Sequence, residues 1–284
     1  MQRSICLDPR VEALGAAARK ARRRTGPVIV AASAISTWFW CPRKAWLDNT
    51  LFNTGWLSDR EVQRHRDALA SLWKAQLLRS RKPSVKLGRR IHGEYVGAEL
   101  EEYDECLLVE MGARGLIDPA EYEKQLEKLE KATDPVLYFR EEEWPMFRYV
   151  GEGFEILGVP DEVTRGRNGY VIVELKTTRS PERFLNGPGY QGALHQLAAY
   201  YITLSTRWPV EEAVLVVVDQ RSRRTVREVH LNPEQLESLA RESLEIAKKL
   251  ASTKPPEPLS DNRRCRSCEY NTPPASCVTM ETLL

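Results

Sequence analysis

One stretch decides the fold of this chain: Gly158-Val-Pro-Asp161-Glu-Val-Thr-Arg-Gly-Arg-Asn168-Gly169-Tyr-Val-Ile-Val-Glu174-Leu-Lys176. Asn168-Gly169 is a strong short-range signal for a β-hairpin turn. The residues that follow, 170–175, read as a strand that is apolar on both faces, which is typical of the middle of a sheet. This strand nevertheless ends in Glu174 and Lys176, which share a face because side chains alternate along a strand.

The hairpin predicts where a third charged residue, Asp161, lies. Counting outward from a turn at Asn168-Gly169 pairs Val163 with Glu174 and Asp161 with Lys176. Any loop with an even number of residues keeps the same faces, so the three charged side chains project to one side. The carboxylates are then diagonal neighbours, roughly 7–8 Å apart at the backbone, and can share one divalent cation. A structural salt bridge fits these residues equally well, because a buried charge is costly unless it is paired or metal-bound.

The composition is that of an ordinary globular protein. The 284 residues are 42% hydrophobic and 29% charged, with a formal net charge of +2, so nucleic-acid binding would need local basic patches. Candidate patches lie at 19–24, 89–90, 221–224 and 263–264. No apolar run approaches the length of a membrane span. The basic-then-apolar stretch 22–36 starts too late for a signal peptide, so we expect a cytoplasmic protein without a membrane partner.

The hydrophobic pattern predicts helices before and after a mixed sheet, an α/β or α+β arrangement. We expect helices at 59–81, at 85–105, from Pro119, at 190–205 and at 233–251, the last capped by Asn232. Strands are expected at 136–140, 147–157, 213–219 and 225–231, and a loop at 181–189. The chain divides into a basic N-terminal extension (1–30), a helical part (31–96), an acidic helical insertion or lid (97–147), a core (148–254) and a tail (255–284).

The tail holds half of the six cysteines, namely Cys265, Cys268 and Cys277. A tail this short can hardly bury a core, and a bound metal would order it. Three thiolates need a fourth ligand, for which Cys41 in its aromatic surroundings is the best candidate. Four cysteines suit zinc or an iron–sulfur cluster. One Cys-x-x-Cys pair with two single cysteines favours iron–sulfur, while unligated thiols are the simpler alternative; Cys6 and Cys106 have no partner pattern.

Three further residues are candidates for the site only in combination with the two carboxylates. His92 lies one helical turn after Gly88, and a metal held by two carboxylates still needs ligands. Gln196 and Tyr200 are one turn apart on the helix expected after the hairpin, and they face the same way. Taken alone, a structural histidine and an ordinary helix surface are the simpler interpretations.

Taken in order, these residues resemble the RecB-type branch of the PD-(D/E)XK nucleases. The resemblance rests on Gly88-Arg-Arg-Ile-His92, Pro160-Asp161, Glu174-Leu-Lys176 and Gln196-x-x-x-Tyr200. Cys41-Pro-Arg-Lys-Ala-Trp46, combined with the three-cysteine tail, is similar to the CRISPR-associated iron–sulfur exonucleases, the Cas-four family. The resemblance implies a restriction-endonuclease-like α/β core with a mixed central sheet, and a small iron–sulfur subdomain joining the chain ends. Its basic N-terminal arm and acidic segment make this chain longer than a compact member.

The resemblance also implies roles for individual residues. Mg²⁺ or Mn²⁺ would be held by His92, Asp161, Glu174 and the backbone carbonyl of Leu175, with Lys176 acting beside the metal. Gln196 and Tyr200 would position DNA, and a structural [4Fe-4S] cluster would be held by Cys41, Cys265, Cys268 and Cys277.

The implied activity is a 5′-to-3′ exonuclease acting on single-stranded DNA or overhangs. It would trim spacer precursors for CRISPR integration, with the Cas-one integrase and Cas-two as partners. One alternative is a RecB-like repair nuclease that serves a helicase. The helicase would be a separate chain, because no Gly-x-x-x-x-Gly-Lys-Ser/Thr loop is present here. Another is a catalytically inactive, zinc-stabilised nucleic-acid-binding module.

Overall fold

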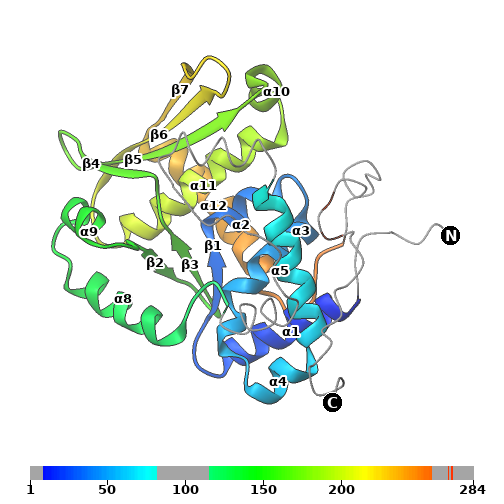
Figure 1. Ribbon diagram of the computed structural model, residues 1–284. Helices are drawn as coiled ribbons and strands as arrows, with labels where there is room; N and C mark the ends of the chain where they lie inside the picture. The colour runs from blue at the N-terminus through cyan, green and yellow to red at the C-terminus, as the bar shows by residue number, and fades with distance from the viewer. Residues whose placement is uncertain (1–8, 82–114, 258–267, 269, 271–284) are drawn as a thin grey trace.

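The computed structural model describes residues 9–81, 115–257, 268 and 270. These residues form an α/β fold in which helices cover two mixed sheets (Figure 1). The first sheet has the order β1-β3-β2, with β1 at Val28–Ala31, β2 at Phe147–Val150 and β3 at Phe154–Gly158. Strand β1 runs parallel to β3, and β2 runs antiparallel to it.

The second sheet contains the hairpin strands and has the order β4-β5-β6-β7. Its strands are β4 (Glu162–Arg165), β5 (Tyr170–Thr178), β6 (Val210–Asp219) and β7 (Thr225–Leu231). Strand β5 lies inside the sheet, between antiparallel β4 and parallel β6, which confirms the prediction from its apolar faces. The chain passes from the first sheet to the second through residues 159–161, so Asp161 lies at the seam between them.

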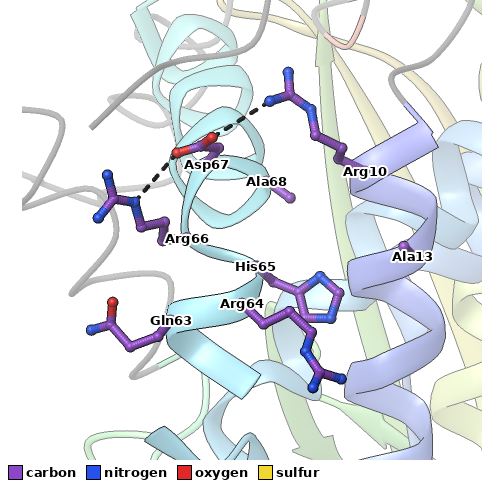
Figure 2. Close-up of a pocket in the computed structure, with 8 residues that line it drawn as sticks. All are labelled: Arg10, Ala13, Gln63, Arg64, His65, Arg66, Asp67 and Ala68. Carbon is purple, nitrogen blue, oxygen red and sulfur yellow. Dashed lines mark hydrogen bonds and ion pairs between the residues drawn. The ribbon is translucent and has the colours of Figure 1, made fainter. Parts of the chain in front are cut away.

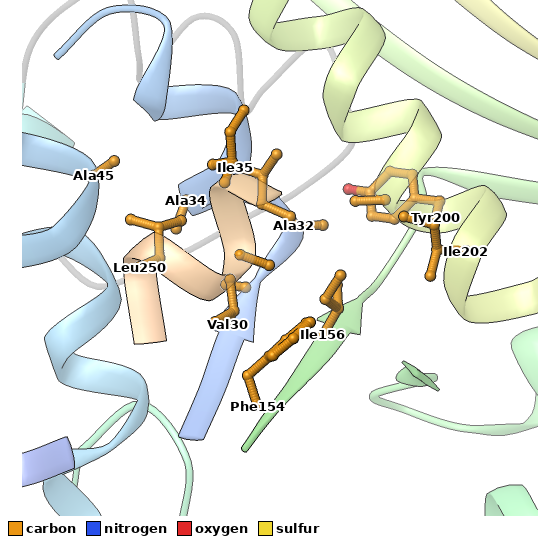
Figure 3. Close-up of a cluster of buried hydrophobic side chains, with 14 of the residues drawn as sticks. Val30, Ala32, Ala34, Ile35, Ala45, Phe154, Ile156, Tyr200, Ile202 and Leu250 are labelled. Atoms are coloured by element: carbon orange, nitrogen blue, oxygen red, sulfur yellow. The ribbon is translucent and has the colours of Figure 1, made fainter. Parts of the chain in front are cut away.

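One helix, α11 (Pro188–Ser205), packs against both sheets, contacting β2, β3, β5 and β6. It also contacts α2 (Ala32–Trp38) and α12 (Pro233–Ala251). Figure 3 shows its Tyr200 among buried side chains that include Val30 of β1, Ile156 of β3 and Leu250 of α12. Helix α11 therefore carries side chains directly to the seam.

The remaining helices surround this centre (Figure 1). They are α1 (Pro9–Arg23), α3 (Pro42–Asp48), α4 (Asp59–Arg64), α5 (Arg66–Arg81), α8 (Pro119–Lys131), α9 (Pro135–Glu141) and α10 (Pro181–Leu185), with 3₁₀ turns at Asn49–Phe52 and Thr54–Trp56. Across the described part of the chain, every helix is too short or too polar to cross a membrane.

The helices at 119–131 and 233–251 confirm the sequence prediction, as does strand β7. The apolar face of α8, which includes Tyr122, Leu126 and Leu129, is buried. Asn232 caps α12 by accepting the amide N–H of Gln235, as its side chain type predicts. The helix predicted at 85–105 lies outside the described residues.

Other predicted elements are wrong or divided. Residues 136–140 are not a strand but part of α9, because Asp134 accepts the amide N–H groups of Val136 and Leu137 and so starts a helix. The single strand predicted at 147–157 is the β2–β3 hairpin, which turns at Gly153 with a φ of +74°. His65 interrupts the helix predicted at 59–81, and the loop predicted at 181–189 contains α10.

The register predicted for the central hairpin is wrong by two residues. The structure pairs Arg165 with Tyr170 and Glu162 with Val173, so the loop has four residues, 166–169. Because an even shift keeps every side chain on its face, the predicted common face survives. Continuing this register one step places Asp161 opposite Glu174 instead of diagonal to it.

The four-residue loop has a tertiary cause. A type I′ turn would need a positive φ at both central residues, but neither Asn168 nor Gly169 has one. The carboxylate of Glu211 in β6 instead accepts the amide N–H of Arg167, at 2.9 Å, and that of Asn168. This bracing from the neighbouring strand holds the wider loop.

The predicted basic patch at 19–24 is partly internal. Arg19 is fully buried in α1, and its guanidinium stacks on the Trp46 ring with 3.9 Å between Cζ and the ring centroid. It donates hydrogen bonds to the carbonyl oxygens of Trp46 (2.8 Å) and Leu250 (2.9 Å). Burial lowers the pKa of Arg19 to about 9. Arg22 is also buried and pairs with Glu155, so neither side chain is exposed for DNA.

Replacing Arg19 with methionine should lower the free energy of unfolding by about 3 kcal/mol, because buried carbonyl oxygens lose their donors. Urea unfolding followed by circular dichroism measures the change. Lys20→Met, at the exposed neighbouring position, is the matched control and should leave stability unchanged. Equal midpoints for the two variants would contradict this role for Arg19.

Candidate active site

Asp161 stands at the seam between the sheets, one residue before β4. Its Oδ2 accepts the amide N–H of Leu175 at 2.6 Å. The N–H and C=O groups of one strand residue point toward the same neighbour. The carbonyl of Leu175 is therefore directed to the side on which Asp161 lies, beyond the last β4–β5 pair at Glu162 and Val173.

Glu174 is a buried carboxylate on β5, only 3% exposed. One oxygen, Oε1, contacts the Lys176 ammonium. The other oxygen, Oε2, has no donor within hydrogen-bond geometry in the described part of the chain, although the Tyr200 hydroxyl lies close enough to the carboxylate to lower its pKa. Burial raises the pKa of Glu174 to about 7; the positive charge of Lys176 partly offsets this rise, and the negative charge of Asp161 reinforces it.

A hydrogen-bonded chain runs from Lys176 into helix α11. Lys176 Nζ donates to Gln196 Oε1 at 2.9 Å, and Gln196 Nε2 donates to the Tyr200 hydroxyl at 2.6 Å. Burial, followed by the charge of Glu174, raises the pKa of Tyr200 well above its usual value. The structure thus brings Gln196 and Tyr200 to the carboxylates and the lysine, although their proposed roles stay predictions.

A glycine that the sequence analysis did not single out makes room for these hydrogen-bonded side chains. Gly158 ends β3, and a Cβ atom there would lie 2.5 Å from a carbon of the Tyr200 ring. Only a residue without a side chain lets the ring lie this close to the strand. A glycine at the end of a fully buried strand was the available signal.

The other predicted ligands are only partly described. Cys41 is half-buried at the N-cap of α3, and Cys268 is half-buried against the main hydrophobic core. The remaining predicted ligands, His92, Cys265 and Cys277, lie outside the described residues. Within the described ranges, no three side chains of histidine, cysteine, aspartate or glutamate gather closely enough to hold a metal ion.

The oxygen donors at the seam suit a divalent cation. A buried carboxylate oxygen without a hydrogen-bond donor is costly, and a cation beside Glu174 Oε2 would remove that cost. Asp161 and the Leu175 carbonyl supply further hard oxygen atoms, the type preferred by Mg²⁺ and Mn²⁺. Two acids against one lysine also leave a net negative charge that a cation would neutralise.

A separate cavity of about 350 Å³ lies where α1 meets the α4–α5 junction (Figure 2). Its lining includes Arg10 and residues 63–68. Asp67 forms ion pairs there with Arg10 and Arg66. None of the predicted site residues that the structure describes lines this cavity.

Comparisons with known proteins give a family and distant structural likenesses. No curated protein matches the chain. The crystal structure of SSO0001 shares 16% identity, with 89% of this chain and 92% of that one covered and a TM-score of 0.42. A crystal structure named “Putative exonuclease”, from Eubacterium rectale, shares 14% identity, with 93% and 94% covered and a TM-score of 0.39. At these values neither structure bears on substrate or mechanism.

The model of the PD-(D/E)XK nuclease superfamily matches residues 32–272, which include the seam carboxylates, Lys176 and helix α11. The match therefore covers most of the chain and every described element that builds the candidate site. This chain belongs to the PD-(D/E)XK nuclease superfamily.

Proposed function

We propose that this chain is a metal-dependent DNA exonuclease acting on single-stranded ends, with 5′-to-3′ polarity. The observation that carries the proposal is the buried Glu174 carboxylate, which lies beside Asp161 and has one oxygen without a donor in the described structure. Mg²⁺ or Mn²⁺ supplies a water of lowered pKa and neutralises phosphate charge. Asp161, Glu174 and the Leu175 carbonyl would hold the ion, together with His92.

Lys176 would stabilise charge that develops on the phosphate under attack. An ammonium group has three N–H donors, and the described structure directs two of them to Glu174 and Gln196. The side chain is 28% exposed, so the third donor can reach a substrate oxygen. Gln196, itself fixed by Tyr200, holds the ammonium in position. Together these two residues of helix α11 would position the DNA strand.

We propose that Cys41, Cys265, Cys268 and Cys277 hold a structural [4Fe-4S] cluster. Cys41 caps the N-terminus of helix α3, and the Tyr270 hydroxyl donates to Asp48 at the other end of that helix at 2.6 Å. Seven helical residues span about 10 Å, so the point at which Tyr270 is held lies about 10 Å along α3 from Cys41. Cys268 comes two residues before Tyr270 in the chain. The contact of the tail with the helix that Cys41 caps supports one shared centre.

Iron should accompany the protein through anaerobic purification, with about four irons per chain and a brown colour that reductant bleaches. Cys268→Ser should lower the iron content because a thiolate ligand is lost. Metal analysis and visible absorbance measure both. A colourless preparation loaded with zinc would instead support a zinc-stabilised module.

The exonuclease itself is tested with labelled single strands and Mn²⁺. Linear strands should be shortened from the 5′ end, while a circular single strand resists cleavage. Cleavage of the circle would identify an endonuclease, and loss from the 3′ label first would reverse the polarity. Chelation of Mn²⁺ should stop the reaction, since the ion supplies the water and the charge.

We propose spacer-precursor trimming in CRISPR adaptation as the biological role, with the Cas-one integrase and Cas-two as partners. The motif order from Cys41 to Cys277 supports this role. Affinity purification from the native cell separates it from repair. Recovery of the integrase supports adaptation, whereas recovery of a helicase without the integrase supports a RecB-like repair nuclease.

A further inference from the structure

A buried polar cluster joins the tail to two helices. The cluster, here named the Tyr270 clamp, consists of Lys44, Asp48, Gln76 and Tyr270. The Tyr270 hydroxyl donates to Asp48 Oδ1 at 2.6 Å and accepts from Gln76 Nε2 at 2.8 Å. Lys44 Nζ lies 3.1 Å from Asp48 Oδ2, and Gln76 Nε2 also donates to Asp48 Oδ1 at 3.1 Å.

The clamp is internal, which distinguishes it from a chance contact between surface side chains. Lys44, Asp48 and Tyr270 are 7%, 8% and 8% exposed. The Lys44 ammonium also lies over the Tyr270 ring, 5.1 Å from its centroid, where a desolvated cation–π contact is favourable. Removing one member of such a network leaves the buried Asp48 carboxylate underpaired. The fold therefore favours a docked Tyr270.

Helix α3 receives the chain at a second point. The Trp46 indole N–H donates to the carbonyl oxygen of Ser252 at 2.8 Å, just after α12 ends. The chain thus leaves the core beside α3 and is held on α3 again at Tyr270. At the other end of the helix, the carbonyl of Cys41 accepts the amide N–H of Ala45 at 3.0 Å, which fixes Cys41 to the same rigid element.

We propose that Tyr270 is a positioning residue for the iron–sulfur centre: it docks the tail on α3 before metal binds and so sets Cys268 relative to Cys41. This inference rests on the proposed cluster. Its physical basis is preorganisation, because a metal site assembled from unordered ligands must spend binding energy on ordering them. Every contact of the clamp comes from the protein, so none requires the metal.

The first experiment uses metal-free full-length protein and follows alkylation of Cys268 by iodoacetamide with peptide mass spectrometry. Docking should keep this half-buried thiol slow in the wild type. Tyr270→Phe keeps the ring but removes the hydroxyl, and should make alkylation about tenfold faster. Asp48→Asn, which removes the acceptor charge, should act in the same direction. Tyr149→Phe on β2 is the matched control and should react like the wild type.

The second experiment measures iron release from the holoprotein to a chelator under anaerobic conditions. Tyr270→Phe should lose iron about tenfold faster than the wild type and Tyr149→Phe. Equal alkylation rates in wild type and Tyr270→Phe would overturn the docking role. Faster alkylation with unchanged iron release would overturn the positioning role. Wild-type protein that binds no iron would overturn the proposed cluster together with this inference. Wild-type protein that does bind iron, with the same alkylation and iron-release rates in Tyr270→Phe, would overturn this inference alone.

Discussion

Lys176→Met is expected to slow degradation of single-stranded DNA by about 10²–10³-fold, the usual effect of losing one donor that stabilises a transition state. The ammonium is held by Glu174 and Gln196, so it is already oriented when substrate arrives. Methionine keeps an unbranched side chain, one atom shorter than that of lysine, and removes the charge. The measurement is the single-turnover rate on a 5′-labelled strand with saturating Mn²⁺ at about pH 8.

Two controls make this result specific. Lys124→Met replaces an exposed lysine on α8, 62% accessible at its side chain, and should degrade DNA at the wild-type rate. Mn²⁺ affinity should not fall in Lys176→Met, because removing a positive charge beside two carboxylates does not weaken cation binding. Degradation as fast as wild type would mean that the assigned site is wrong. A rate that is lost only below saturating Mn²⁺ and recovered at saturation would instead make Lys176 a support for the metal.

The common face of Asp161, Glu174 and Lys176 could be predicted because it depends only on the alternation of side chains along a strand. The register could not, because the loop is braced by Glu211, which is distant in sequence. Contacts of that kind are invisible to a local turn rule. The error was harmless to the site because an even shift preserves faces.

At helix α9 the prediction was wrong although the deciding signal was local. Residues 136–140 have the β-branched and aromatic composition of a strand, but Asp134 caps the first turn and Pro135 occupies its first position. Local capping therefore outweighed composition. The Asp161–Leu175 hydrogen bond was also beyond sequence reasoning, since it exists only because the chain crosses between two sheets at that residue.

Glu174→Gln is expected to stabilise the metal-free protein at about pH 8 by about 3 kcal/mol. Burial raises the folded-state pKa of Glu174 from 4.5 to about 7, so between these values the folded state binds more protons than the unfolded state. The stability of the metal-free wild type must therefore fall as pH rises from about 5 to 8. Glutamine has no proton to lose there, and its carbonyl oxygen can still accept from Lys176.

Chemical denaturation in the presence of a chelator, at about pH 5 and pH 8, measures this difference. The two proteins should be close in stability at the lower pH and diverge at the higher one. Added Mn²⁺ should reverse the order, because a ligand that binds only the folded wild type stabilises it by mass action. Glu142→Gln, which removes a less buried acid paired with Lys128, should show neither the divergence nor the reversal. A wild type whose stability is flat across this range would mean that Glu174 is satisfied without a cation, and that the seam is a structural salt bridge.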